Sequence, residues 1–201
     1  MAKQDQIRKQ PLRYKTAIVC GGSKGIGKET AKEIVLLGGS VCVIARHTEP
    51  LEAAAREMQE LVREDSQFVE IIKCDATDIE RLEPLLTEFV DQHGVPDYLI
   101  NCVGYAYPQY VQDLSLADYR NAMDVNYFGQ LVPTLILLPH FISARKGYIA
   151  NVSSVLGFTG IMGYATYAPT KFAIVGLTEV LRNELKPYGI RLSILFPPDT
   201  D

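Results

Sequence analysis

The sequence has few of the residues that metal centres and hydrolytic triads require. Its three histidines, His47, His93 and His140, lie far apart along the chain. No serine, histidine and aspartate, and no cysteine and histidine, are arranged as a nucleophilic triad or pair. The acidic residues, histidines and cysteines also form no cluster with metal-ligand spacing. The sequence therefore favours neither a hydrolase of those classes nor a metalloenzyme, and we expect no bound metal.

Cysteine is scarce and shows no paired motif. Each of the four cysteines stands in or just after a predicted strand, and no two form a Cys-x-x-Cys pair; they are Cys20, Cys42, Cys74 and Cys102. Four cysteines suffice for zinc by number but not by spacing. We expect buried, reduced thiols, which are typical of a reducing compartment.

An excess of one charge and a long apolar run are missing too. The net charge is -4, so we expect no general attraction to nucleic acid. No signal peptide and no stretch long enough to span a bilayer is found, which predicts a cytoplasmic protein. Residues 1–13 form a basic tail, which is either solvated or in peripheral contact with the cytosolic face of an anionic membrane.

Apolar strands alternate with helices along the rest of the chain. The predicted strands cover residues 16–20, 41–45, 68–73, 97–101, 147–152 and 190–196, and the predicted helices cover 25–37, 51–63, 79–93, 116–143 and 167–186. Continuous apolar strands separated by helices are typical of a parallel sheet covered on both faces. We therefore predict an α/β, Rossmann-like, doubly wound fold, with a single domain over residues 14–201.

The helix predicted over residues 116–143 contains an unusual stretch at 131–142. This stretch is apolar on nearly every face, and its Pro133 and Pro139 are expected to bend it. A helix packed on a sheet needs only one apolar stripe. The extra apolar face predicts a homodimer or homotetramer formed through the 116–143 and 167–186 helices; the alternative is a helix buried within one chain.

A glycine-rich turn follows the first predicted strand and opens a helix. Its residues are Gly21, Gly22, Ser23, Lys24, Gly25, Ile26 and Gly27. Glycines allow a sharp turn and a close approach of the backbone to phosphate, and the helix start supplies N–H donors. In this strand-to-helix context the turn predicts a dinucleotide-binding site.

The end of the second strand indicates which dinucleotide binds. An NAD site would place a carboxylate here for the ribose 2′-hydroxyl, whereas this chain has Arg46. Arg46 and Lys24 can clamp a 2′-phosphate, which favours NADPH over the alternative of two solvent-facing cations. Asp75, after the third strand, is placed to meet the adenine or, with Asp78, to cap a helix.

The fourth and fifth strands lead to the candidate reacting groups. Asn101 to Gly104 form a small-residue turn that lets the nicotinamide lie against the sheet. Tyr167 and Lys171 are spaced i and i+4 on one helix face, and the lysine is expected to lower the pKa of the tyrosine. Ser154, after the fifth strand, can donate to a substrate oxygen. This combination can reduce a carbonyl or oxidise an alcohol.

These motifs resemble those of the classical short-chain dehydrogenases/reductases from Tyr14 to the last residue. The resemblance rests on the glycine turn, the element from Asn101 to Gly104, and a catalytic set at Asn126, Ser154, Tyr167 and Lys171. Within the family the chain is most similar to the 3-ketodihydrosphingosine reductases, through 21–27, Asn101-Cys102, 186–188 and 197–201. Cys20, Cys102, Val103 and Pro169 depart from the family pattern.

The resemblance implies reduction of 3-ketosphinganine, a long-chain keto-lipid, by NADPH. It implies that Tyr167 protonates the oxygen, Ser154 positions it, Lys171 binds the nicotinamide ribose and Asn126 holds a water. It adds Pro197 to the cofactor-binding residues. The alternatives are another hydrophobic carbonyl or alcohol as substrate, and a nucleotide-binding regulatory protein without turnover. The family usually continues past a sixth strand into a substrate loop and a seventh strand, so we expect this sequence to be part of a longer protein.

Overall fold

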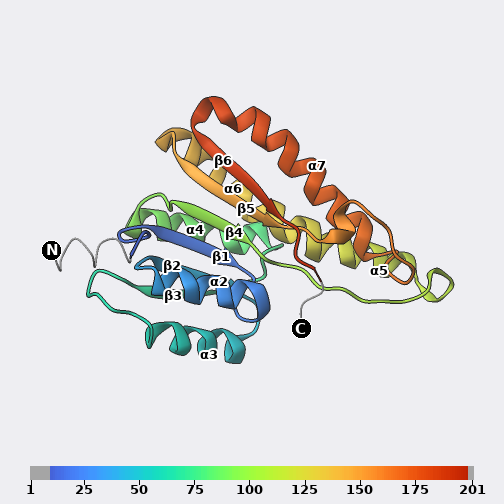
Figure 1. Cartoon of the computed structure of the whole chain (residues 1–201), viewed down its shortest axis with the longest axis horizontal. Coiled ribbons are helices and arrows are strands. Elements are labelled where there is room, and N and C mark those ends of the chain that lie inside the picture. The colour runs from blue at the N-terminus through green and yellow to red at the C-terminus, as the bar shows by residue number, and fades with distance from the viewer. Residues whose placement is uncertain (1–9, 199–201) are drawn as a thin grey trace.

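The computed structural model describes residues 10–198, which form a six-stranded parallel sheet between helices (Figure 1). The strands are β1 (Thr16–Cys20), β2 (Ser40–Ala45), β3 (Val69–Lys73), β4 (Tyr98–Asn101), β5 (Gly147–Val152) and β6 (Ile190–Leu195). They lie in the order β3-β2-β1-β4-β5-β6, and every neighbouring pair is parallel. This is the strand order of the doubly wound fold, so the predicted fold class is confirmed.

The helices follow the predicted alternation. They are α2 (Gly25–Leu36), α3 (Thr48–Gln59), α4 (Ile79–His93), α5 (Leu116–Met123), α6 (Gly129–Ala144) and α7 (Tyr167–Leu185). Four short helical turns complete the list: η1 (Val111–Asp113), η2 (Asp124–Phe128), η3 (Val155–Gly157) and η4 (Lys186–Tyr188).

The bounds of α3 differ most from the prediction of 51–63. The helix begins at Thr48, which places Pro50 in the first turn, where its missing N–H costs no hydrogen bond. It ends at Gln59 because the chain beyond folds back on itself. There the Gln67 side chain accepts hydrogen bonds from the backbone N–H groups of Arg63 and Glu64.

The alternation of side chains along β1 divides the core in two. Ala17 and Val19 belong to the cluster that packs under α2 and α3. Ile18 and Cys20 point to the other face and join the cluster formed with α4, α6 and the end of α7. All four side chains are fully buried, as expected for a central parallel strand with both faces covered.

The helix predicted over 116–143 is continuous, but it is not α-helical throughout. α5 and α6 are joined by the π-helical segment η2, so the helical run extends from Leu116 to Ala144. This run is long and apolar enough, by length and composition, to cross a membrane, which corrects the expectation that the chain has no such stretch. Its buried polar side chains Asn126, Gln130 and Thr134 form hydrogen bonds inside the fold, as in a core helix.

The predicted basic tail is only partly within the described residues. Residues 1–9 lie outside them. Leu12 packs against the α2 side of the core and its backbone N–H donates to Leu37 O, and Arg13 pairs with Glu64 at 2.6 Å. Residues 10–13 therefore pack with the domain assigned to 14–201.

Candidate active site

The candidate site is a cleft of about 820 Å³ at the carboxyl ends of the strands. β1 and β4 are neighbours, but the chain leaves them toward opposite sides of the sheet, and such a switch point is where ligands bind in this fold. Most of the predicted site residues line this one cleft: Gly21, Ser23, Lys24, Gly25, Ile26, Gly27, Arg46, Asp75, Gly104, Ser154, Tyr167, Lys171 and Pro197. Asn101 and Asn126 do not line it.

The glycine turn needs its glycines for space and for conformation. Gly21 has φ +80°, and a Cβ there would lie 2.8 Å from the backbone nitrogen of Val103. Gly25 has φ +52° and faces open space, so its backbone stays accessible from the cleft. No side chain caps the start of α2 at Lys24, which leaves the first N–H groups of the helix free for an anion.

Arg46 and Asp75 face each other on the part of the cleft beside β2 and β3. Arg46 Nη1 lies 3.5 Å from Asp75 Oδ2, and both side chains are about half exposed. The other oxygen of Asp75 accepts from the backbone N–H and the hydroxyl of Thr77 at 3.0 and 2.9 Å. The side chain that caps α4 is that of Asp78, which accepts a hydrogen bond from the backbone N–H of Arg81. Asp75 does not cap this helix, and its carboxylate lines the cleft.

Asn101 ties β4 to β5 below the cleft. Its side-chain amide donates to Thr134 Oγ1 at 3.1 Å and to Asn151 Oδ1 at 2.8 Å, and the residue is fully buried. Gly104, three residues on, does line the cleft. A Cβ at Gly104 would lie 3.2 Å from Lys171 Nζ, so a side chain there would crowd the reacting groups.

Tyr167 and Lys171 are brought together by the first turn of α7. The helix begins at Tyr167, so Pro169 falls in the first turn, as its missing N–H requires. Lys171 Nζ lies 5.4 Å from the centre of the Tyr167 ring and donates to Val152 O at 3.0 Å. Burial lowers the pKa of Lys171 to about 8, and the nearby Cys102 thiol opposes this shift.

Tyr167 departs from the expectation of a lowered pKa. Burial raises the pKa of the Tyr167 phenol above its ordinary value, and the Ser154 hydroxyl opposes part of the rise. The effect of burial prevails because Lys171 lies over the ring, and no hydrogen bond joins the two side chains in the described part of the chain. The phenol therefore keeps its proton at neutral pH, which suits a proton donor.

The turn after β5 positions Ser154 against α7. Ser154 Oγ accepts from the backbone N–H of Leu156 at 3.2 Å and thereby opens η3. The neighbouring Ser153 hydroxyl donates to Lys171 O at 3.0 Å. This contact fixes the serine turn to the helix that carries Tyr167 and Lys171.

Asn126 lies behind the cleft, in the π-helical segment η2. Its Oδ1 accepts from Tyr105 N at 2.8 Å, and its Nδ2 donates to Tyr105 O at 3.0 Å and to Thr170 Oγ1 at 3.1 Å. The residue is fully buried. Asn126 thus connects the segment after Gly104 to the start of α7.

Apolar side chains line part of the cleft. Tyr105, Val155, Leu156 and Ile161 line the cleft, whereas Tyr107, Tyr110, Phe158 and Met162 lie outside it and are exposed. Cys102 and Val103, within the predicted turn from Asn101 to Gly104, also line the cleft. Sequence reasoning missed several other cleft residues, including Val125, Ser153, Tyr164 and Pro198. Ser153, Tyr164 and Pro198 are direct neighbours of predicted residues or lie one turn from them, which is the signal that could have found them.

The cysteines behave as buried apolar side chains. Cys20, Cys42 and Cys74 are buried and Cys102 is half-buried, and all four are free thiols. Burial raises the pKa of Cys20 and Cys42 well above the ordinary value and that of Cys102 to about 12. Thiols with such pKa values are poor nucleophiles.

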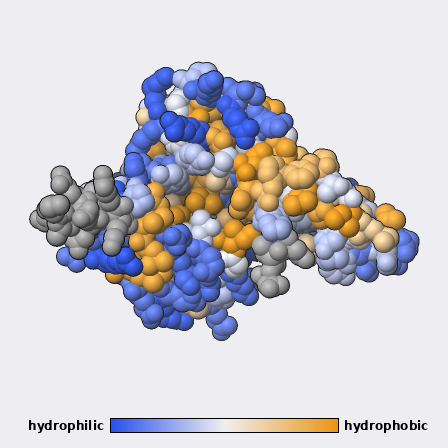
Figure 2. Space-filling model, viewed as in Figure 1, coloured by the Kyte–Doolittle hydropathy of each residue, from blue (hydrophilic) through white to orange (hydrophobic). Residues whose placement is uncertain are grey.

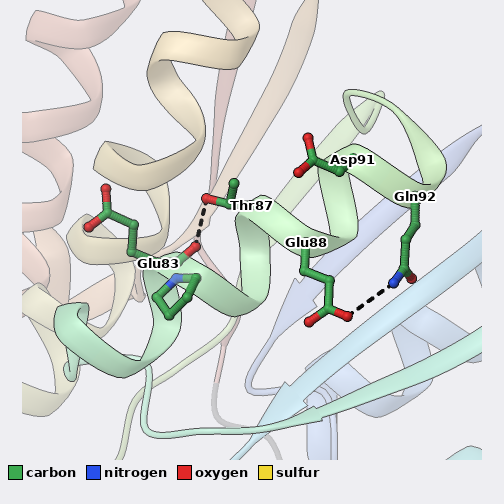
Figure 3. Close-up of a pocket in the computed structure, with 6 residues that line it drawn as sticks. Glu83, Thr87, Glu88, Asp91 and Gln92 are labelled. Carbon is green, nitrogen blue, oxygen red and sulfur yellow. Dashed lines mark hydrogen bonds between the residues drawn. The ribbon is translucent and has the colours of Figure 1, made fainter.

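A second hollow, of about 630 Å³, lies on the outer side of α4 (Figure 3). Two hydrogen bonds join its residues along the helix itself: Thr87 donates to Glu83 O and Gln92 donates to the Glu88 carboxylate. None of the predicted site residues lines it. The candidate functional residues therefore lie in the cleft at the strand ends and not in this hollow.

The sequence pattern of the short chain dehydrogenases matches residues 15–201. The chain belongs to the short chain dehydrogenase family. Similar members include the 3-dehydrosphinganine reductase of Danio rerio, at 35% identity over 97% of this chain and 60% of that protein. The 3-ketodihydrosphingosine reductase of Dictyostelium discoideum is 37% identical over 94% of this chain and 61% of that protein. The chain thus spans about three fifths of these relatives.

Solved structures of the family superpose well on this short chain dehydrogenase. A metagenomic short-chain oxidoreductase in complex with NADP has a TM-score of 0.85 at 27% identity, over 94% of this chain and 84% of that one. An NAD+-bound xylitol dehydrogenase has a TM-score of 0.88 at 27% identity, over 93% of this chain and 71% of that one. The match covers the sheet and its helices.

Proposed function

We propose that this short chain dehydrogenase uses NADPH to reduce a long-chain ketone, 3-ketosphinganine or a close analogue, to the alcohol. One observation carries the proposal. Ser154, Tyr167 and Lys171 share a cleft with the glycine turn, so a proton donor and a dinucleotide site face the same space. The names of the two relatives given above support 3-ketosphinganine as the substrate.

The residues of the cleft fit a nicotinamide dinucleotide. The open backbone at Gly25 and the uncapped start of α2 suit a pyrophosphate, and Gly104 leaves room for a flat ring beside Lys171. Arg46 and Lys24 supply the positive charge that suits a 2′-phosphate, which favours NADPH. When bound, the cofactor supplies a hydride to the carbonyl carbon.

The side chains of this protein supply the proton and hold the carbonyl. Tyr167 donates its phenolic proton to the carbonyl oxygen as the hydride reaches the carbon, which completes the alcohol. Ser154 donates a hydrogen bond to the same oxygen. The Lys171 ammonium stabilises the phenolate that Tyr167 leaves. Because both N–H groups of the Asn126 amide are already donated, to Tyr105 O and Thr170 Oγ1, Asn126 is proposed to hold through an oxygen the water that returns a proton to Tyr167.

The apolar wall of the cleft supports a hydrophobic substrate. Val155, Leu156 and Ile161 line the side beyond Ser154, and Tyr105 lines the opposite segment after β4. A second candidate class is another hydrophobic carbonyl compound. It is favoured by similarity to a fatty acyl-CoA reductase of Acinetobacter baylyi, 28% identical over 98% of this chain and 66% of that protein.

A peripheral contact with the cytosolic face of a membrane is part of the proposal. Residues 104–112 and 153–170 contain no charged side chain. These two segments meet beside the cleft, where Gln109 N donates to Gly163 O at 2.8 Å. Figure 2 shows hydrophobic residues over the middle of the viewed face, near the carboxyl ends of β5 and β6. A lipid substrate could enter the cleft from a bilayer held against them.

A homo-oligomer formed through the α5–α6 run and α7 is also proposed. Leu135, Phe172 and Val180 are apolar, yet between 46% and 53% of each residue is exposed. α5, whose Leu116 is exposed, and α7 lie side by side, so exposed side chains of the α5–α6 run and of α7 are proposed to contribute to one contact surface. Burial of such surface in a second copy would stabilise a dimer.

The proposed function is tested by NADPH consumption with 3-ketosphinganine. The panel includes a fatty acyl-CoA, a short-chain ketone and a steroid ketone at matched concentration. The proposal predicts the highest kcat/KM with 3-ketosphinganine. A higher value with the acyl-CoA would support the second class, and no consumption with any member would contradict reductase function.

A further inference from the structure

Gln130 occupies a position that links the ends of two strands. It is the second residue of α6 and is 1% exposed. Its Nε2 donates to Val103 O at 3.1 Å, just beyond β4, and to Val152 O at 2.9 Å, the last residue of β5. The chain after Val103 leads to Gly104, and the chain after Val152 leads to Ser154. These two segments form opposite walls of the cleft.

The orientation of the Gln130 amide is determined by these contacts. Two backbone carbonyls accept from one nitrogen, which uses both of its N–H groups. If the amide were reversed, its oxygen would face two other oxygens, which is unfavourable. Gln130 Oε1 is buried and has no hydrogen-bond partner in the described part of the chain, so the two donated bonds are the polar contacts of this side chain.

Val152 O is shared with the candidate catalytic lysine. Lys171 Nζ donates to the same oxygen at 3.0 Å, so the Gln130 amide and the Lys171 ammonium bind one carbonyl. Strands β4 and β5 are already joined by the hydrogen bond between the side chains of Asn101 and Asn151, which come just before Val103 and Val152 in the chain. The Gln130 link therefore adds a connection at the point where the ammonium is held.

We propose that Gln130 is a positioning residue: its amide holds the Val152 carbonyl on the Lys171 ammonium and fixes the separation of the two cleft walls. The inference rests on the proposed role of Lys171. A backbone carbonyl held by a second donor cannot turn away from the ammonium. Gln130 thereby determines both the position of the Lys171 ammonium and how readily this ammonium loses its proton.

The other groups that act on Lys171 are few. In the described part of the chain they are the Cys102 thiol, beyond the end of β4, and the Tyr167 phenol on α7 itself. Both are neutral at pH 7, because burial raises the pKa of each. A new charge at position 130 would therefore act on Lys171 without a competing ion close by.

Two variants of equal size separate this role from simple support of the fold. Gln130→Met removes the donor without adding charge, so the freed Val152 carbonyl supports the ammonium less well and the Lys171 pKa falls. Gln130→Glu also removes the donor, but its carboxylate adds an opposite charge and raises the Lys171 pKa by about one unit or more. A role limited to packing would leave the Lys171 pKa unchanged in Gln130→Met. The carboxylate of Gln130→Glu would raise the Lys171 pKa under either role, so this variant shows that the measurement detects a change at position 130.

The Lys171 pKa is measured by NMR on cofactor-free protein with labelled lysine side chains, and the signal is assigned with Lys171→Arg. This measurement needs no substrate, so it is independent of whether the proposed reaction is correct. The control is Thr178→Val, which removes a buried hydrogen bond to Asn151 farther along α7 and should lower the melting temperature only.

The proposal predicts a fall in Gln130→Met, a rise in Gln130→Glu and no change in Thr178→Val. With NADPH and ketone, both Gln130 variants should also lose about tenfold or more in kcat through misplacement of Lys171. An unchanged or raised Lys171 pKa in Gln130→Met would overturn the proposal. If Gln130→Met does not fold, Gln130→Asn, whose shorter amide cannot reach both carbonyls, should show the same fall.

Discussion

Lys171 Nζ lies 5.4 Å from the centre of the Tyr167 ring, one helical turn away at the start of α7. The two groups respond to burial in opposite ways. The phenol becomes harder to ionise, and the ammonium becomes easier to deprotonate, with a pKa of about 8. At neutral pH the pair therefore offers a protonated tyrosine beside a lysine that is mostly charged, the state that the proposed ketone reduction needs.

Tyr167→Phe should abolish most of the reduction while it preserves the fold. The substitution removes only the hydroxyl, and loss of a general acid typically costs about two to four orders of magnitude in rate. Turnover and NADPH affinity are measured side by side, by absorbance and by calorimetry. Near-normal turnover would show that another group donates the proton.

Lys171→Met should inactivate the protein and stabilise it. The pKa of Lys171 falls from 10.5 to about 8 on folding, so the unfolded state binds more protons between these values and stability increases with pH across that window. Below pH 8 the full cost of burying the ammonium is present. The variant should gain on the order of 1–3 kcal/mol at pH 7.

Urea unfolding at pH 7 and pH 10 tests this difference. The gain from Lys171→Met should be largest at pH 7 and should shrink as the pH approaches 10.5, with the wild-type protein as reference. Loss of stability at pH 7 would mean that the hydrogen bond to Val152 outweighs the cost of burial.

Arg46→Ala should weaken NADPH and leave NADH nearly unaffected. Loss of a charge-assisted contact to the 2′-phosphate should cost on the order of 1.5–3 kcal/mol of binding. Affinities for both cofactors are measured by calorimetry, with Arg56→Ala as a control because this exposed arginine lies on α3 and not in the cleft. Equal weakening of both cofactors would assign Arg46 to support of the fold through Asp75.

Val180→Lys should convert the proposed oligomer to monomer. Val180 is 53% exposed on α7, and a charge there would have to be buried in the contact between copies. Sedimentation velocity gives the state, and Ile79→Lys, an equally apolar exposed site at the start of α4, is the control. An oligomer that persists in Val180→Lys would place the interface elsewhere.

The fold was predictable because most of its strands are short, largely apolar runs bounded by turns. The glycine turn could be placed at the carboxyl end of β1 for the same reason. A tight turn between a buried strand and a helix can lie at few other places in this fold. Spacing also placed Tyr167 and Lys171 together, since residues i and i+4 share a helix face.

Other features depend on contacts that no local pattern contains. The π-helical segment η2 surrounds Asn126, whose side chain is held by Tyr105 and Thr170 from distant segments. Gln130 was not predicted because its partners Val103 and Val152 are backbone groups. The direction of the Tyr167 pKa depends on burial of the phenol, which spacing along a helix does not report.

The central claim is that the cleft transfers a hydride from NADPH to a long-chain ketone with Tyr167 as the proton donor. The most direct measurement uses NADPH carrying deuterium at the transferred position, with 3-ketosphinganine as substrate and mass spectrometry of the product. The account predicts sphinganine with one deuterium on the former carbonyl carbon, and little product from Tyr167→Phe. Product without deuterium, or no product from the wild-type protein under conditions where it binds NADPH, would contradict it.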